Sequence, residues 1–279
     1  MKNLSTTNDV GASLRDSISS IVMKGYAVTK IPKSAQTAIW TALDGIDAVS
    51  SELKRSFSFP NETDGFLPMG GEHAKYTTNL DLCDRFCYWY KNRHVHRGHE
   101  FTNENLYTAI VACEKEMHAM AQQLISGIWN FFNGADEVRV RENSYLQVCV
   151  YANKYREDER NYLQDCHEDG HLITLIKPTR DGLVIFPAGP KNPEVSVFLR
   201  DDELLAITGS LLTAISEEKI PPMYHAVRNP FVRMMRKSIV YFAIPDLSQS
   251  YTTFFSRNEI DISKLADESH RAFGNSTLI

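Results

Sequence analysis

Apolar side chains recur at helical spacing in three segments of the first half of the chain. Residues 9–24 place them three or four positions apart, and Gly25 stands where a C-terminal cap is expected. A second helical pattern runs over residues 34–56, after Pro32. The third, over residues 105–132, is long and amphipathic, so we expect a helix that packs along the back of a sheet.

The second half of the chain changes to short runs of β-branched, aromatic and other apolar residues. Turns with Gly, Pro, Asn or Asp separate these runs, as an antiparallel sandwich or barrel requires. Two earlier segments, residues 26–31 and 85–90, have the same character. The strands predicted in the second half are residues 145–151, 172–177, 183–187, 195–199, 204–208, 225–228 and 237–244.

The order of these patterns predicts helices first, then an all-β core, then a short helical tail after Pro245. No internal repeat, low-complexity tract or break in composition marks a second domain. We therefore predict a single domain over residues 1–279. Its parts are a mostly helical segment at 1–140, the core at 141–246 and a tail at 247–279.

Composition and charge narrow the classes of partner. Charged residues make up 23% of the chain and the net charge is −5, with no long basic run of the kind that binds a phosphate backbone. No stretch approaches the roughly 20 apolar residues of a membrane helix. The five cysteines are odd in number and lie mostly in apolar segments, which favours reduced thiols. We expect a cytoplasmic protein without a nucleic-acid or membrane partner.

The stretch H-E-D-G-H at residues 167–171 comes immediately before the predicted strand 172–177. If that strand continues backward, His167 and Asp169 share one face, and an imidazole and a carboxylate can reach the same divalent cation. His225 begins another predicted strand and supplies a further imidazole. Two histidines and one carboxylate form the facial triad that binds iron(II) and leaves positions open for other ligands.

A possible carboxylate anchor follows His225 in the sequence. Arg236 and Ser238 lie two residues apart on a predicted strand and so share a face. A guanidinium group with a hydroxyl beside it is well matched to a carboxylate. Arg228 and Arg233 remain alternative anchors. A metal with open positions next to such an anchor indicates a keto-acid cosubstrate.

These motifs resemble the isopenicillin N synthase-like branch of the non-haem Fe(II), 2-oxoglutarate-dependent oxygenases. The resemblance is carried by H-E-D at residues 167–169 with L-I-T-L after it, by H-A-V-R-N-P at 225–230, and by R-K-S at 236–238 before Y-F-A-I-P. It implies a mainly β fold with flanking helices. The core would be a distorted double-stranded β-helix, or jelly roll, braced by N-terminal helices and a long helix.

The resemblance also implies a set of site residues. These are His167, Asp169 and His225 as ligands of Fe(II), Arg236 and Ser238 as the anchor for the far carboxylate of 2-oxoglutarate, and Tyr151 as a further contact of this cosubstrate. Cys149 stands where the N-x-Y motif of the family has its Asn, two positions before the tyrosine.

The implied activity is the oxidation of an unactivated C–H bond of a small metabolite by O2 and 2-oxoglutarate, with release of succinate and CO2. Hydroxylation is the usual outcome, and desaturation and cyclisation are variants. An amino acid or a natural-product intermediate is the expected substrate. Two alternatives stay open: an Fe(II) oxidase of the isopenicillin N synthase kind, which uses no 2-oxoglutarate, and a non-redox β-barrel protein that binds a metal.

Other titratable residues have less specific assignments. His171 is expected to line the substrate pocket or to pack in the core, because a fourth protein ligand would block the open metal positions. Glu168 is expected to be a solvated acid or one that supports the ligands. His94, His96 and His99 lie in a polar segment, for which we predict a solvated loop rather than a zinc site.

Overall fold

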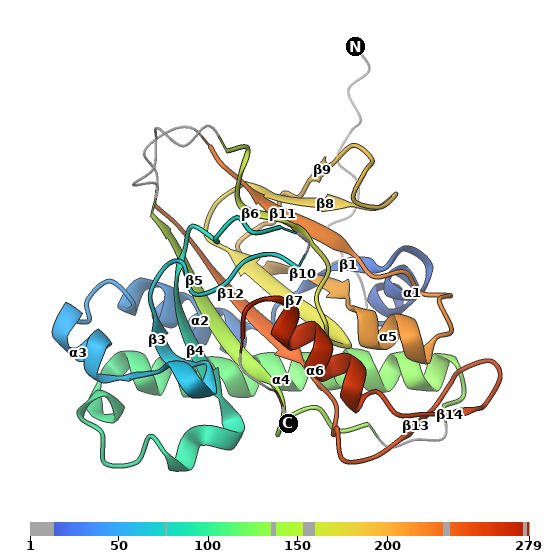
Figure 1. Cartoon of the computed structure of the whole chain (residues 1–279), viewed down its shortest axis with the longest axis horizontal. Coiled ribbons are helices and arrows are strands. Elements are labelled where there is room, and N and C mark those ends of the chain that lie inside the picture. Colours follow the sequence, from blue (N-terminus) through green and yellow to red (C-terminus); the bar gives the residue numbers. More distant parts are fainter. Residues whose placement is uncertain are drawn as a thin grey trace.

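The computed structural model describes residues 14–75, 77–134, 138–152, 160–230, 235–275 and 278, and its core consists of two antiparallel sheets (Figure 1). In spatial order, the eight strands of the major sheet are β1 (Tyr26–Lys30), β10 (Glu203–Thr208), β7 (Ile173–Pro178), β12 (Met235–Ala243), β5 (Tyr145–Ala152), β4 (Asp84–Trp89), β3 (Asp64–Leu67) and β2 (Ser58–Phe59). The four strands of the minor sheet are β6 (Tyr162–His167), β11 (Tyr224–Arg228), β8 (Leu183–Phe186) and β9 (Val195–Ser196).

Apolar side chains bury both faces of the major sheet. On one face, side chains of both sheets form a single cluster that includes Ile176 of β7, Leu183 of β8 and Val227 of β11. On the other face, a larger cluster joins the sheet to the helices. The predicted sandwich of short antiparallel strands is therefore present, and the space between its two sheets is where inward-facing polar side chains can meet.

Helices cover the outer face of the major sheet. The longest, α4 (Asn105–Phe131), runs behind the sheet as its sequence pattern predicted (Figure 1). The first predicted helix is observed as α1 (Leu14–Lys24), and residues 9–13 lie outside the described part of the chain. The remaining helical and short elements are α5 (Ser210–Ile215), α6 (Ser263–Ala272), the 3-10 segments Pro60–Glu62, Tyr90–His94 and Glu100–Asn103, and the strand pair β13 (Tyr251–Thr252) and β14 (Glu259–Ile260).

The single helix predicted over residues 34–56 is wrong. The chain forms two helices there, α2 (Lys33–Gly45) and α3 (Ser51–Ser56). Ser50 adopts an extended conformation, and its side chain accepts a hydrogen bond from the backbone N–H of Leu53 at 3.1 Å. A serine in that position begins a new helix, since it satisfies one of the N–H groups that a helix start leaves without a partner.

The strand predictions differ from the structure at three places. Strand β6 was not predicted, because only two of its six side chains are buried and Gln164 and Asp165 interrupt any apolar pattern. The run 195–199 contains only the two-residue strand β9. Strands β1 to β4 belong to the mostly helical segment 1–140, yet they join the same sheet as the core strands.

Two further properties concern membrane-spanning helices and the cysteines. None of the helices in the described part of the chain has the length and apolarity needed to cross a lipid bilayer. All five cysteines are free thiols, and four of them are buried.

Candidate metal and cosubstrate site

Three side chains meet between the two sheets. His167 is the last residue of β6, and His225 lies directly opposite it in the antiparallel register of β11, with the two ring centroids 4.3 Å apart. Asp169 follows two residues after the end of β6. Its carboxylate oxygens lie 3.6 Å from Nε2 of His167 and 3.9 Å from Nε2 of His225. One ligand atom from each of the three lies within 4.8 Å of the others, and all three residues are buried.

The local structure that brings Asp169 to this point is a turn, not the strand that the sequence suggested. Strand β7 begins at Ile173, and residues 168–172 carry the chain from the minor sheet to the major sheet. The prediction that Asp169 lies on a strand is therefore wrong. Backbone hydrogen bonds fix this turn: the N–H of Ser210 donates to the carbonyl of Asp169 at 2.8 Å, and the N–H of Gly209 to the carbonyl of Leu172 at 3.1 Å.

The protonation states in this group suit a cation. The Nδ1 of His167 lies 2.7 Å from the carbonyl of Asp165 and donates to it, so Nε2 is the ring nitrogen that faces Asp169. Burial acts to lower the pKa of His167, but the carboxylate of Asp169 outweighs it and raises the pKa. Burial lowers the pKa of His225 to about 4, which keeps that ring neutral. Burial acts to raise the pKa of Asp169, but the imidazoles of His225 and His167 outweigh it and keep the pKa well below its usual range. The hydroxyl of Thr174 donates to the same carboxylate at 2.6 Å.

Arg236 and Ser238 lie on β12 and are both buried. In the register of β12 and β5, Arg236 is opposite Tyr151 and Ser238 is opposite Cys149. The guanidinium carbon of Arg236 lies 5.1 Å from the centroid of the Tyr151 ring. Its three nitrogens have no hydrogen-bond partner among the described residues, although the side chain is only 3% exposed. Burial lowers the pKa of this arginine.

One cavity connects these two groups. It is lined by the three clustered residues, by Arg236 and Ser238, and by the ring of Tyr151. Its volume, about 30 Å³, is enough to hold water. Its apolar wall consists of Ile176, Leu183, Val227, Val240 and Phe242. A candidate metal centre and a candidate anion anchor therefore share one space, as the sequence predicted.

A buried polar network beside the site was missed in the sequence analysis. Tyr151 donates its hydroxyl to Oε1 of Gln164 at 3.0 Å, and the amide of Gln164 donates to Asp81 at 3.0 Å. Asp81 in turn pairs with the guanidinium of Arg85, whose Nε lies 2.8 Å from a carboxylate oxygen of Glu72. The sequence feature that could have indicated this network is Arg85, a charged residue inside the apolar strand pattern 85–90.

The C-terminal tail also reaches the site. The ring centroid of Phe273 lies 5.5 Å from that of His167, and Ser269, His270 and Phe273 line a small space together with Asp169 and His171. His171 packs against the rings of Phe242 and Tyr145, and burial lowers its pKa to about 4. Its predicted role as pocket lining or packing agrees with this position. No sequence motif in the tail predicted its contact with the site.

Three other charged residues with predicted roles are Glu168, Arg228 and Arg233. Glu168 is not solvated: it is 4% exposed, and Lys75 donates to its Oε1 at 2.9 Å. Arg228, an alternative carboxylate anchor, is exposed at the end of β11 and pairs with Glu194, so it does not reach the cavity. Arg233, the other alternative, lies outside the described residues.

The predicted solvated loop with three histidines is wrong for His96. This side chain is fully buried, with Nε2 2.9 Å from a carboxylate oxygen of Asp64 and Nδ1 3.1 Å from the hydroxyl of Tyr107. His99 accepts a hydrogen bond from the backbone of a 3-10 turn at its Nδ1, and His94 is exposed. Among the described residues, only His167, Asp169 and His225 form a cluster with the geometry for a metal ion.

Comparisons with known proteins find similarity in structure only. No protein-family model and no curated protein sequence matches the chain. Neurospora crassa T7H in complex with alpha-KG and 5-formyluracil is 16% identical with a TM-score of 0.72, over 94% of this chain and 90% of that one. The rice dioxygenase for auxin oxidation is 13% identical with a TM-score of 0.73, over 92% and 88% of the two chains.

A third solved structure, JOX2 in complex with 2OG, Fe and JA, is 12% identical with a TM-score of 0.67, over 92% of this chain and 80% of that one. At such identities the similarity shows the fold. The predicted jelly roll with flanking helices is thereby confirmed, and the chain shares this fold with structures that contain alpha-KG or 2OG.

Proposed function

We propose that the chain is a non-haem Fe(II), 2-oxoglutarate-dependent oxygenase that acts on a C–H bond of a small metabolite. The observation that carries the proposal is the buried guanidinium of Arg236, which has no hydrogen-bond partner among the described residues and lines the same cavity as His167, Asp169 and His225. The fold shared with structures that contain alpha-KG, and in one case Fe, supports it.

The three clustered residues fit a ferrous ion by their chemistry. Two imidazoles and one carboxylate are the donor set of non-haem Fe(II) oxygenases, and three protein ligands leave the remaining positions open. Asp169 lies close to both imidazoles, so a divalent cation among the three would replace the proton that holds His167 and Asp169 together. In this position the carboxylate stays ionised and His225 stays neutral, which are the forms that bind metal.

Arg236 and Ser238 fit the far carboxylate of 2-oxoglutarate. A buried guanidinium without a partner is unfavourable, whereas a carboxylate would supply the missing acceptors and neutralise the charge. The hydroxyl of Tyr151 is already used by Gln164, so we assign Tyr151 to support of Arg236 through its ring rather than through a hydrogen bond to the cosubstrate.

The chain's own residues would position the reactants. Bound Fe(II) would supply the activation of O2, which in this chemistry is coupled to conversion of 2-oxoglutarate into succinate and CO2, with one oxygen atom transferred to the substrate. Arg236 fixes the distal end of the cosubstrate, and the histidines and Asp169 fix the ion. The apolar wall, which includes Leu183 and Val227, keeps water away from the reacting groups.

Three finer assignments belong to the same proposal. We place the chain in the isopenicillin N synthase-like branch because its H-x-D, distal His and R-x-S motifs follow that pattern. We propose an amino acid or a natural-product intermediate as the substrate, and the small molecules 5-formyluracil and JA in two structural neighbours support a small substrate. Five free cysteines support a cytoplasmic location.

The decisive experiment measures succinate formation and O2 uptake with Fe(II), with and without 2-oxoglutarate, over a panel of amino acids and related metabolites. We expect both signals to require 2-oxoglutarate and to rise with the correct substrate. The variant Asp169→Ala should reduce both to background while its thermal unfolding stays cooperative.

Two outcomes would contradict the proposal. Substrate-dependent O2 uptake without 2-oxoglutarate, and without succinate, would indicate an oxidase of the isopenicillin N synthase kind. Stoichiometric Zn(II) that resists exchange by Fe(II), with no charge-transfer band when 2-oxoglutarate is added without oxygen, would indicate a non-redox metal protein.

A further inference from the structure

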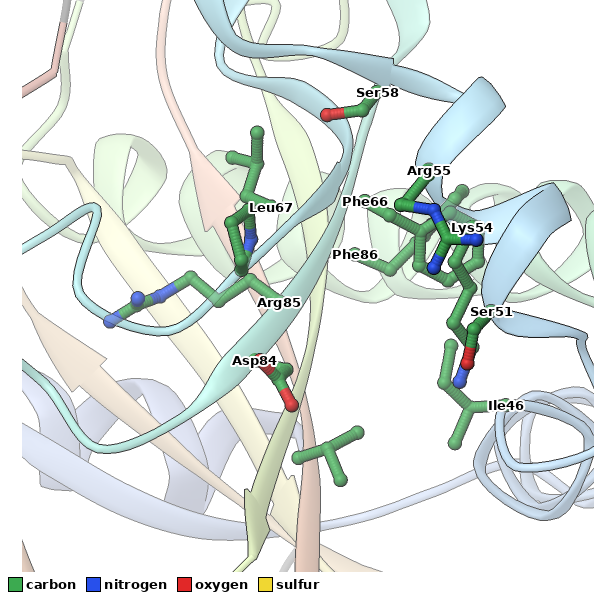
Figure 2. A pocket seen from close by; sticks show the side chains of 12 residues that line it. Ile46, Ser51, Lys54, Arg55, Ser58, Phe66, Leu67, Asp84, Arg85 and Phe86 are labelled. Atoms are coloured by element: carbon green, nitrogen blue, oxygen red, sulfur yellow. The ribbon is translucent and has the colours of Figure 1, made fainter.

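A second, larger cavity lies on the other face of the major sheet. Its volume is about 470 Å³, within the range of small-molecule pockets, and its walls come from α3 and from β3, β4 and β5 (Figure 2). Along β5, Val150 lines this cavity, whereas the neighbouring Cys149 and Tyr151 line the metal-site cavity. Because successive side chains of a strand point to opposite faces, the sheet separates the two spaces.

The floor of this cavity consists of aromatic and aliphatic side chains that pack against one another. Phe66 of β3 and Phe86 of β4 meet edge to face, with ring centroids 4.6 Å apart. Ile46 and Val150 complete the floor, and Leu67 at the side is half-buried. Contact with these side chains would remove the apolar part of a ligand from water.

The wall opposite the strands carries two cations. Lys54 and Arg55 lie in the last turn of α3, and neither forms an ion pair or a side-chain hydrogen bond with any described residue. The ammonium of Lys54 lies 5.8 Å from the centroid of the Phe66 ring. Figure 2 shows both cations on the helix side and Asp84 on the strand side of the cavity. Asp84 already accepts a hydrogen bond from the backbone N–H of Met69 at 3.0 Å.

We propose that this cavity binds a small amphipathic carboxylate. The apolar body of the ligand packs on Phe66 and Phe86, and its carboxylate binds Lys54 and Arg55. Charge selects this class, since the two cations at the helix side outnumber the single carboxylate of Asp84 and would repel an amphipathic amine. Because the sheet separates this cavity from the metal ligands, its ligand is distinct from the oxygenase substrate, and the inference stands independently of the proposed function.

The proposal is tested by titration calorimetry of the full chain with octanoate and with octylamine, which share the same tail. We expect saturable binding of one octanoate per chain and at least about tenfold weaker binding of octylamine. The double variant Lys54→Glu/Arg55→Glu should lose at least about tenfold in octanoate affinity, since two charged hydrogen bonds are replaced by repulsion. The control Lys24→Glu changes an exposed cation in the last turn of α1 and should keep the parent affinity.

Two further variants locate the bound octanoate. Arg236→Ala removes the other candidate carboxylate anchor and should keep the parent affinity, whereas Val150→Thr replaces an apolar methyl group in the floor of the second cavity by a hydroxyl and should weaken binding severalfold. Loss of binding in Arg236→Ala would place octanoate in the metal-site cavity and overturn the proposal. Absence of saturable binding, equal affinity for octylamine, or an unchanged affinity in the double charge variant would also overturn it. Circular dichroism melts confirm that each variant is folded.

Discussion

At the scale of the residue, Arg236 lowers the stability of the folded chain but serves the proposed binding of 2-oxoglutarate. Its guanidinium is buried without a hydrogen-bond partner among the described residues, and only the face of the Tyr151 ring is near it. Burial of an unpaired charge costs free energy, so the folded chain without cosubstrate is less stable than it would be with an apolar side chain there. A carboxylate ligand removes that cost and thereby gains affinity.

This conflict predicts opposite effects of Arg236→Met on stability and on cosubstrate use. We expect the free energy of unfolding without cosubstrate to rise by about 1–4 kcal/mol. The affinity for 2-oxoglutarate should fall by about 2–5 kcal/mol, because the charged contact with the carboxylate is lost. Urea unfolding and the dependence of succinate formation on 2-oxoglutarate measure the two effects. The control Arg228→Met replaces an exposed arginine and should change neither by more than about 1 kcal/mol. Unchanged dependence on 2-oxoglutarate in Arg236→Met would remove this residue from the cosubstrate site.

At the scale of the element, the turn after β6 determines whether the ligands meet. Sequence patterns predicted that His167, Asp169 and His225 converge, but for a wrong reason, since Asp169 lies in a turn between the sheets. Strand alternation is a rule for neighbouring residues and cannot show where a chain leaves one sheet for another. The backbone N–H groups of Gly209 and Ser210, some forty residues later, fix the turn, and such long-range contacts leave no local pattern.

The junction between β10 and α5 therefore offers a test of the site that touches no ligand side chain. A Cβ atom on Gly209 would lie 2.3 Å from the carbonyl oxygen of His171 and 2.7 Å from that of Asp169, so Gly209→Ala must displace the turn. We expect a loss of about 1–3 kcal/mol in unfolding free energy and weaker binding of Co(II), as a spectroscopic substitute for Fe(II), at equal folded fraction. Gly71→Ala, at an exposed glycine whose new Cβ has its nearest neighbour at 3.7 Å, is the matched control. Parent-like Co(II) affinity in Gly209→Ala would show that the turn does not position Asp169.

At the scale of the whole molecule, periodicity predicted the layers and missed the contacts that join distant segments. The helix α4 and most of the core strands follow from apolar patterns in the sequence, whereas β6 does not. His96 could not be placed, because its partner Asp64 is 32 residues away and the pair is satisfied only inside the folded chain. The same holds for the tail: Phe273 lies against His167, and His270 contacts the rings of Trp89 and Tyr145. The C-terminal helix is thus part of the wall around the site.

Docking of that helix makes the stability of the whole chain depend on pH. His270 is 5% exposed, and burial lowers its pKa from 6.5 to about 4. The folded chain keeps this ring neutral, whereas the unfolded chain accepts a proton below pH 6.5, so the free energy of unfolding must fall as the pH decreases from 6.5 towards 4. The contribution of His270 over that interval is about 3 kcal/mol, and none of it appears above pH 6.5.

The variant His270→Gln isolates this contribution, because His171 and His225, whose pKa values are also lowered to about 4, remain in both proteins. Urea unfolding of parent and variant between pH 7.5 and pH 4.5 gives two stability profiles. We expect the profile of the variant to fall less steeply below pH 6.5, by up to about 1.4 kcal/mol per pH unit. Parallel profiles would mean that His270 is accessible to protons in the folded chain. The C-terminal helix α6 would then not pack beside the metal site in solution.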